Sequence, residues 1–249
     1  MARLYWDCNA RDQGSPASSR TLPWFGEPGP ESGFGTSSLR RMSRLHFRGF
    51  LDFSLTARTF DSCEYSLDPN TAHRKLKLSE DRRTVTFVCK EQQYPDHEDR
   101  FTDWPQVLSC TGLRGRCYWE VDWSGELVDI AVSYRGIRRR GETEECWFGG
   151  NDQSWSLRIF GGDYHFYHNN RHTNLSSSSS LPSGRVSVLL DSEAGSLSFY
   201  DVGSDGKLSH LHTSGCSFTE PLFLGFRLWR EDDSVSVVDL RRASPAEPL

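Results

Sequence analysis

The sequence predicts an all-β protein, a sandwich of two antiparallel β-sheets. Short segments of alternating apolar and polar residues recur along the chain, and turn-forming residues separate them. Two pairs of these segments are close enough in the sequence to form β-hairpins, over residues 154–168 and residues 185–200. Aromatic residues make up 12% of the 249 residues, a proportion that suits a sandwich core built from large side chains.

The central strand is expected over residues 116–123, after a turn marked by Gly112 and Gly115. Its alternate side chains are bulky and apolar on one face and more polar on the other. The apolar face consists of Cys117, Trp119, Val121 and Trp123. These side chains, together with Trp155 of the first hairpin, are expected to pack in the core.

The same alternation predicts the neighbouring strands. Residues 128–134 form one strand, and residues 76–78 and 85–87 form two short strands around a polar turn. In the first hairpin, the Gly-Gly-Asp sequence at 161–163 supplies the turn. Residues 171–183 include five consecutive serines and are expected to form a long loop.

Residues 1–55 differ from the rest of the chain and are expected to form a disordered or poorly ordered N-terminal arm. Gly, Pro, Ser and Arg dominate residues 13–43, and neither a helical nor a strand period is sustained there. Within this arm, Trp24-Phe25 could act as a short linear motif, although an isolated apolar pair in a linker is more common.

Neither the cysteines nor the histidines form a metal-binding motif. The chain has seven cysteines, an odd number, with no Cys-x-x-Cys pair, so the spacing of a zinc site is missing and reduced thiols are expected. His210 and His212 are two residues apart without a third ligand at a suitable spacing, which favours a structural or solvent-facing role. No metal and no cofactor are therefore expected.

Catalytic motifs are also missing from the sequence. There is no Gly-x-Ser-x-Gly elbow, no phosphate-binding glycine loop and no His-Glu-x-x-His helix. A net charge of −5 argues against nucleic acid as the main partner, because phosphate binding uses a basic surface. Since no run is long enough to span a membrane and no signal peptide is evident, we expect a cytoplasmic protein without membrane contact.

Several motifs resemble the PRY-SPRY (B30.2) domain. Gly-x-x-Gly-Arg-x-Tyr-Trp-Glu-Val occupies residues 112–121, and Leu-Asp-Pro-Asn-Thr-Ala occupies residues 67–72. Ser-Trp-x-Leu follows at 154–157, and the hairpin over 185–200 carries a third family signature. These motifs occur in the family's order over residues 61–240, and they are most similar to the fish branch of NLR-type receptors, tripartite-motif-like proteins and stonustoxin-like proteins.

The resemblance implies a concanavalin-like B30.2/SPRY sandwich over residues 56–241. A PRY segment would cover about residues 61–110 and a SPRY segment about residues 111–241, followed by a tail over 242–249. The resemblance also implies a Greek-key-like strand order and a few short helical turns near the N-terminus. Neither a RING-type Cys/His array nor coiled-coil heptads accompany the motifs, so ligase activity is not implied.

For function, the resemblance implies a non-catalytic module that recognises a protein partner through variable loops, in innate-immune or ubiquitin-related signalling. The alternative is a truncated fragment of a larger NLR-type receptor, tripartite-motif-like or stonustoxin-like protein. An enzyme is a less favoured possibility, which a deep pocket with perturbed pKa values would support. A monomer is the default expectation for the oligomeric state.

The positions that match the family's binding loops are Arg135, Arg158, Phe160 and Trp229. Arg, Phe and Trp at the ends of strands are typical of interface hot spots, although each could also be an ordinary core or surface residue. Arg158→Ala and Trp229→Ala are expected to weaken partner binding and to leave thermal stability nearly unchanged. The three arginines at 138–140 could bind an acidic partner, but a solvated loop is the more common role for such a run.

Overall fold

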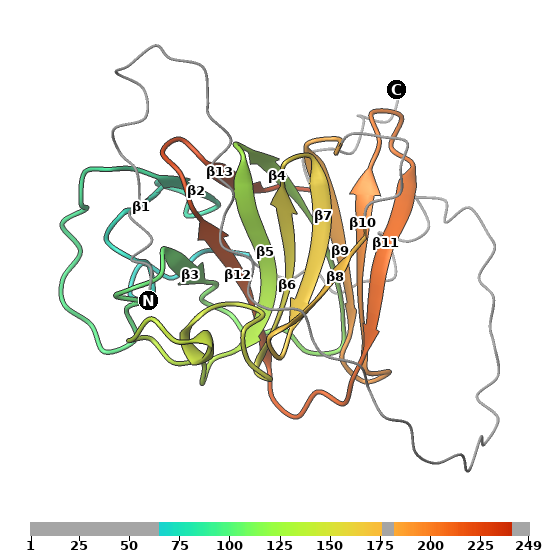
Figure 1. Cartoon of the computed structure of the whole chain (residues 1–249), viewed down its shortest axis with the longest axis horizontal. Coiled ribbons are helices and arrows are strands. Elements are labelled where there is room, and N and C mark those ends of the chain that lie inside the picture. Colours follow the sequence, from blue (N-terminus) through green and yellow to red (C-terminus); the bar gives the residue numbers. More distant parts are fainter. Residues whose placement is uncertain (1–64, 176–181, 241–249) are drawn as a thin grey trace, which may run out of the picture. The chain divides into compact units, whose positions relative to one another are not determined.

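The structure, a computed structural model, describes residues 65–175 and 182–240, which form two antiparallel β-sheets (Figure 1). This confirms the expected β-sandwich. The predicted N-terminal arm, residues 1–55, and the predicted tail, residues 242–249, lie outside the described residues. Within the described ranges, the helical element is one 3₁₀ turn, η2 (Glu144–Cys146), so the short helical turns expected near the N-terminus are not found there.

Each sheet draws on strands from distant parts of the sequence. The seven-stranded sheet has the spatial order β1 (Leu76–Leu78), β2 (Thr84–Phe87), β13 (Ser234–Val237), β4 (Arg116–Ser124), β9 (Arg185–Asp191), β10 (Ser196–Val202) and β11 (Leu208–Gly215). The six-stranded sheet has the order β3 (Gln106–Leu108), β12 (Leu222–Leu228), β5 (Leu127–Tyr134), β6 (Ser154–Phe160), β7 (Asp163–His168) and β8 (Arg171–Asn174).

The core lies between the two sheets, and strand alternation determines which side chains fill it. In β4 the apolar face is buried as predicted for Cys117, Trp119 and Val121, and Trp155 of β6 is buried opposite them. Trp123, at the end of β4, is only partly buried against this core. Figure 1 shows β5, β6 and β7 of one layer in front of β4 and β9 of the other.

Both predicted hairpins are present. β6 pairs with β7 across a two-residue turn, and β9 pairs with β10. The expected long loop over residues 171–183 is wrong at its start, because residues 171–174 form the edge strand β8, paired with β7. The sequence gives no alternation there, since β8 is exposed on both faces. The signal is instead the turn: Asn169 and Asn170 both have positive φ, 51° and 56°, the geometry of a tight hairpin.

Cys110, Cys117, Cys146 and Cys216 are not disulfide-bonded, whereas Cys89 is in a disulfide, so the expectation of reduced thiols is wrong at Cys89. Within residues 65–175 and 182–240, no helix has the length and apolar character needed to span a bilayer.

Candidate functional site

A row of charged and polar side chains crosses the outer face of the six-stranded sheet. The strand register pairs Arg227 of β12 with Asp129 of β5, and Asp129 in turn with Arg158 of β6. Arg158 is paired with His165 of β7. The residues on either side of each of these positions are buried between the sheets, so the four side chains lie on the face away from the core. We call these four residues the charged row.

Asp129 is the centre of the row. Its Oδ2 atom accepts hydrogen bonds from Arg227 Nε at 2.6 Å and from Trp229 Nε1 at 2.8 Å. Its Oδ1 atom accepts one from Arg158 Nε at 2.8 Å. Burial of the carboxyl acts to raise the pKa of Asp129, but the charges and hydrogen bonds of the two arginines outweigh it, and the pKa is lowered. Asp129 is therefore a carboxylate, held by these three donors and, at a longer distance of 3.5 Å, by Ser156 Oγ.

Arg227 is enclosed by aromatic rings. Its guanidinium carbon lies 4.5 Å from the ring centroid of Trp229, 4.8 Å from that of Trp147 and 5.6 Å from that of Trp104. Its two terminal nitrogens are buried without a hydrogen-bond partner. Cation–π interactions with the electron-rich ring faces therefore stabilise the guanidinium in place of hydrogen bonds. Burial lowers the pKa of Arg227 to about 10, with Asp129 acting in the opposite direction, and the side chain stays charged at neutral pH.

Of the three charged side chains Asp129, Arg158 and Arg227, Arg158 is the one that solvent reaches. Its side chain is 16% exposed, whereas Asp129 and Arg227 are fully buried. The guanidinium carbon of Arg158 lies 4.4 Å from the ring centroid of Tyr167 and 5.0 Å from that of Trp229. Two arginines thus surround one carboxylate, and aromatic rings pack on both guanidinium groups. We call this set of residues the arginine–aromatic cluster: Asp129, Arg158, Arg227, Trp147, Tyr167 and Trp229.

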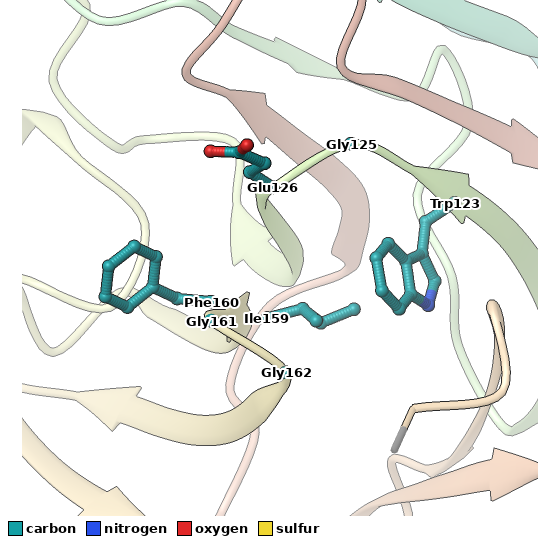
Figure 2. Close-up of a pocket in the computed structure, with 7 residues that line it drawn as sticks. All are labelled: Trp123, Gly125, Glu126, Ile159, Phe160, Gly161 and Gly162. Carbon is teal, nitrogen blue, oxygen red and sulfur yellow. The ribbon is translucent and has the colours of Figure 1, made fainter. Parts of the chain in front are cut away.

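Of the four residues that sequence matching proposes, the structure brings Arg158 and Trp229 together in this cluster. Phe160 lies on the same face of β6 as Arg158, two residues further along. It lines an open pocket of about 340 Å³ between the β4–β5 turn and the β6–β7 turn. Figure 2 shows Phe160 and Ile159 pointing to opposite sides of β6, with Ile159 directed toward Trp123. Trp123, expected in the core, contributes to this pocket.

Arg135 lies apart from the cluster. Its guanidinium donates to Asp68 at 2.9 Å and to Asp99 at 2.6 Å, and it packs over the ring of Phe223. Its pKa is raised: burial acts to lower the value, but the hydrogen bonds and charges of the two aspartates outweigh that effect. Asp68 and Asp99 precede the first strands of the six-stranded sheet, so Arg135 ties that part of the chain to the end of β5.

The arginine run at 138–140 is more structured than a solvated loop. Arg139 donates to the backbone carbonyls of Asp99, Ile137 and Arg135, and burial lowers its pKa to about 10. Arg138 is exposed and pairs with Glu145. The middle arginine therefore stabilises the loop and is not presented to a partner.

The residues of the cluster that sequence analysis missed are Asp129, Trp147, Tyr167 and Arg227. Alternation places Asp129 on the polar face of its strand, but it does not show that two arginines from other strands flank it. Only the register of β12, β5 and β6 does so. The signal available in the sequence was the presence of charged residues at outward positions of strands whose other face is entirely apolar.

Metal binding finds no support in the part of the chain that the structure describes. No group of three or more His, Cys, Asp or Glu side chains there is placed to hold an ion. His212 packs on the ring of Phe166, with ring centroids 4.0 Å apart, and His210 is hydrogen-bonded to Thr213 Oγ1 at 2.8 Å. Both histidines thus have local partners within the sheet.

Comparison with known families matches two adjacent segments of the chain. The SPRY-associated domain PRY matches residues 66–113, and the SPRY domain matches residues 116–237. Mouse tripartite motif-containing protein 16 is 36% identical over 181 residues, covering 72% of this chain and 32% of the relative. Stonustoxin subunit beta of Synanceia horrida is 38% identical over 166 residues, covering 66% of this chain and 23% of the relative. The chain thus spans about a third or less of the length of these two relatives.

Solved structures give the same result. The structure of stonustoxin superposes with a TM-score of 0.63 at 35% identity, covering 71% of this chain and 27% of that one. The PSpry domain of TRIM65 superposes with a TM-score of 0.62 at 24% identity, covering 71% of this chain and 91% of that one. The second similarity concerns the fold alone.

Proposed function

This chain belongs to the PRY-SPRY family, and from this membership we propose that it is a protein-recognition module whose partner binds the arginine–aromatic cluster. SPRY domains commonly mediate protein interactions and are not a known class of enzyme. The partner itself is not identified by family membership, so the proposal rests on the chemistry of the surface.

The observation that carries the proposal is the arrangement of Arg158 and Trp229. Arg and Trp are the residue types most enriched among interface hot spots. Here both donate a hydrogen bond to the buried carboxylate of Asp129, so their side chains are fixed before any partner arrives. A preorganised side chain loses little conformational entropy on binding, and this favours affinity.

We propose a cytoplasmic setting in innate-immune or ubiquitin-related signalling, on the basis of the similarity to tripartite motif-containing proteins. The four cysteines without a disulfide among the described residues support a reducing compartment, while the disulfide at Cys89 counts against it. Stonustoxin-like proteins are the alternative setting, supported by comparable sequence identity.

The experiment is affinity capture from cell lysate with the full chain as bait. Three variants are compared with the wild type: Arg158→Gln, Trp229→Leu and the control Arg116→Gln. Arg116 makes the same kind of contact on the other sheet, from its Nε to Asp191 at 2.8 Å. We expect a protein retained by the wild type and by Arg116→Gln to be lost from the other two. Equal retention by all four folded baits would show that the partner binds elsewhere.

A further inference from the structure

The arginine–aromatic cluster carries one more positive charge than negative charge. Among the described residues, Asp129 is the one carboxylate that forms a salt bridge with Arg158 or Arg227. One carboxylate cannot neutralise two guanidinium groups, and the low dielectric of a buried site makes the remaining charge significant. An anion supplied by a partner would complete the charge balance of the cluster.

Only Arg158 can make contact with such an anion. Its Nε atom is already bonded to Asp129, and neither terminal nitrogen has a hydrogen-bond partner within residues 65–175 and 182–240. Arg227 also bonds Asp129 through Nε and also has two terminal nitrogens without a hydrogen-bond partner, but its side chain is fully buried. The planar edge of a guanidinium presents parallel N–H groups that match the two oxygens of a carboxylate.

The surroundings of Arg158 favour a protein carboxylate over a phosphate. The cluster has a single net positive charge, whereas a phosphate monoester carries about two negative charges at neutral pH. The chain as a whole has a net charge of −5, which further disfavours a strongly anionic ligand. The rings of Tyr167 and Trp229 beside Arg158 offer apolar surface on which neighbouring side chains of a partner can pack.

We infer that the partner places one aspartate or glutamate side chain against Arg158, with apolar residues next to it packed on Trp229 and Tyr167. This inference rests on the proposed function and adds the chemistry of the partner to it.

The test is a selection of random linear peptides displayed on phage, with the full wild-type chain as the target. Selected peptides are synthesised, and their Kd is measured by calorimetry for the wild type and for Arg158→Lys, Arg158→Gln, Trp229→Leu and Arg116→Gln. We expect an Asp or Glu at one fixed position of the peptides. Changing it to Asn or Gln, or changing Arg158 to Gln, should weaken binding about tenfold or more.

Arg158→Lys keeps the charge beside Asp129 but lacks the planar edge, so it should bind more tightly than Arg158→Gln and less tightly than the wild type. Arg116→Gln should bind as the wild type does.

The inference is overturned if the peptides require Trp229 but have no fixed acidic position and also bind Arg158→Gln. In that case the proposed function still stands. If no selected peptide is sensitive to a change at Arg158 or at Trp229, both the inference and the proposed function are wrong. If inorganic phosphate displaces the peptides better than acetate does, the ligand is a phosphorylated residue and the carboxylate is rejected.

Discussion

Arg227 and Asp129 form a salt bridge of 2.6 Å in which neither side chain is exposed to solvent. The register of β12 and β5 places them directly opposite each other, so the contact needs no unusual backbone. Two charges removed from water are tolerated only when they are paired and hydrogen-bonded, as they are here through Arg158 and Trp229. The candidate binding surface is therefore also a structural element, and substitutions in it affect both binding and stability.

Replacing Asp129 with Asn removes the charge that holds two guanidinium groups in the sheet. We expect the free energy of unfolding to fall by about 3–5 kcal/mol, because Arg227 would remain buried and charged without a counter-ion. Denaturant titration measures this loss. The control is Asp205→Asn, whose salt bridge with Lys207 is exposed and should show no measurable effect. Equal stability of Asp129→Asn and the wild type would mean that Asp129 does not neutralise this pair.

Arg158→Ala should also destabilise the protein, which replaces the expectation from sequence that thermal stability would hardly change. The variant removes one donor and one positive charge from a buried carboxylate, while Arg227 and Trp229 still bind it. We expect a loss of about 1–3 kcal/mol, smaller than that for Asp129→Asn. Thermal unfolding of the two variants in parallel checks the order, and the reverse order would contradict the geometry of the cluster.

The strands could be predicted from sequence wherever one face is buried. Cys117, Trp119 and Val121 alternate because the sheet packs on a core, and the same logic fails for β8, which buries neither face. Its hairpin instead depends on the conformation of Asn169 and Asn170, a local signal that the serine-rich composition of the following residues obscured.

The candidate site was predictable only in part. Arg158 and Trp229 were found by matching family motifs, but Arg227 and Asp129 are 98 residues apart in the sequence and meet only through the strand register. Arg135 shows the opposite case. It matches a binding-loop position, yet two aspartates from separate loops pair with it, and no local pattern in the sequence indicates such long-range partners.

Gly125 in the β4–β5 turn should not tolerate a side chain. Its φ is +113°, and a Cβ atom would lie 2.8 Å from Cγ of Asp233 and would overlap its carboxylate oxygen. We expect Gly125→Ala to lower the free energy of unfolding by roughly 2–4 kcal/mol, through backbone strain and the shift of Asp233. Gly161→Ala is the matched control, since φ there is +61° and no atom lies within 4 Å of an added Cβ. Its loss should be only about 1–2 kcal/mol, measured by the same denaturant titration.

Asp233 should make the protein more stable as the pH falls from 6 to 4. Burial raises its pKa to about 6, although backbone N–H groups of Trp229 and Arg230 act to lower it. Because the folded state then binds the proton more tightly than the unfolded chain, this contribution is full below pH 4 and is lost as the pH rises through 6. We expect the difference in unfolding free energy between the wild type and Asp233→Asn to change by about 2–3 kcal/mol over this range. A difference independent of pH would show that Asp233 titrates normally.

His165 should make binding of an acidic peptide stronger as the pH falls from 8 to 6. Burial lowers its pKa; Asp163 opposes this effect, while His172 and Arg158 add to it, so the ring is neutral at pH 7 in the free protein. A carboxylate placed against Arg158 adds a negative charge near the ring, which raises the pKa of His165 and couples binding to proton uptake. The Kd of a peptide selected for dependence on Arg158 is measured by calorimetry across this range. It should decrease as the pH falls from 8 to 6 for the wild type and be nearly constant for His165→Gln. The carboxylate of the peptide stays ionised above pH 6, so its own titration does not contribute. An identical pH profile for both proteins would place the carboxylate away from His165.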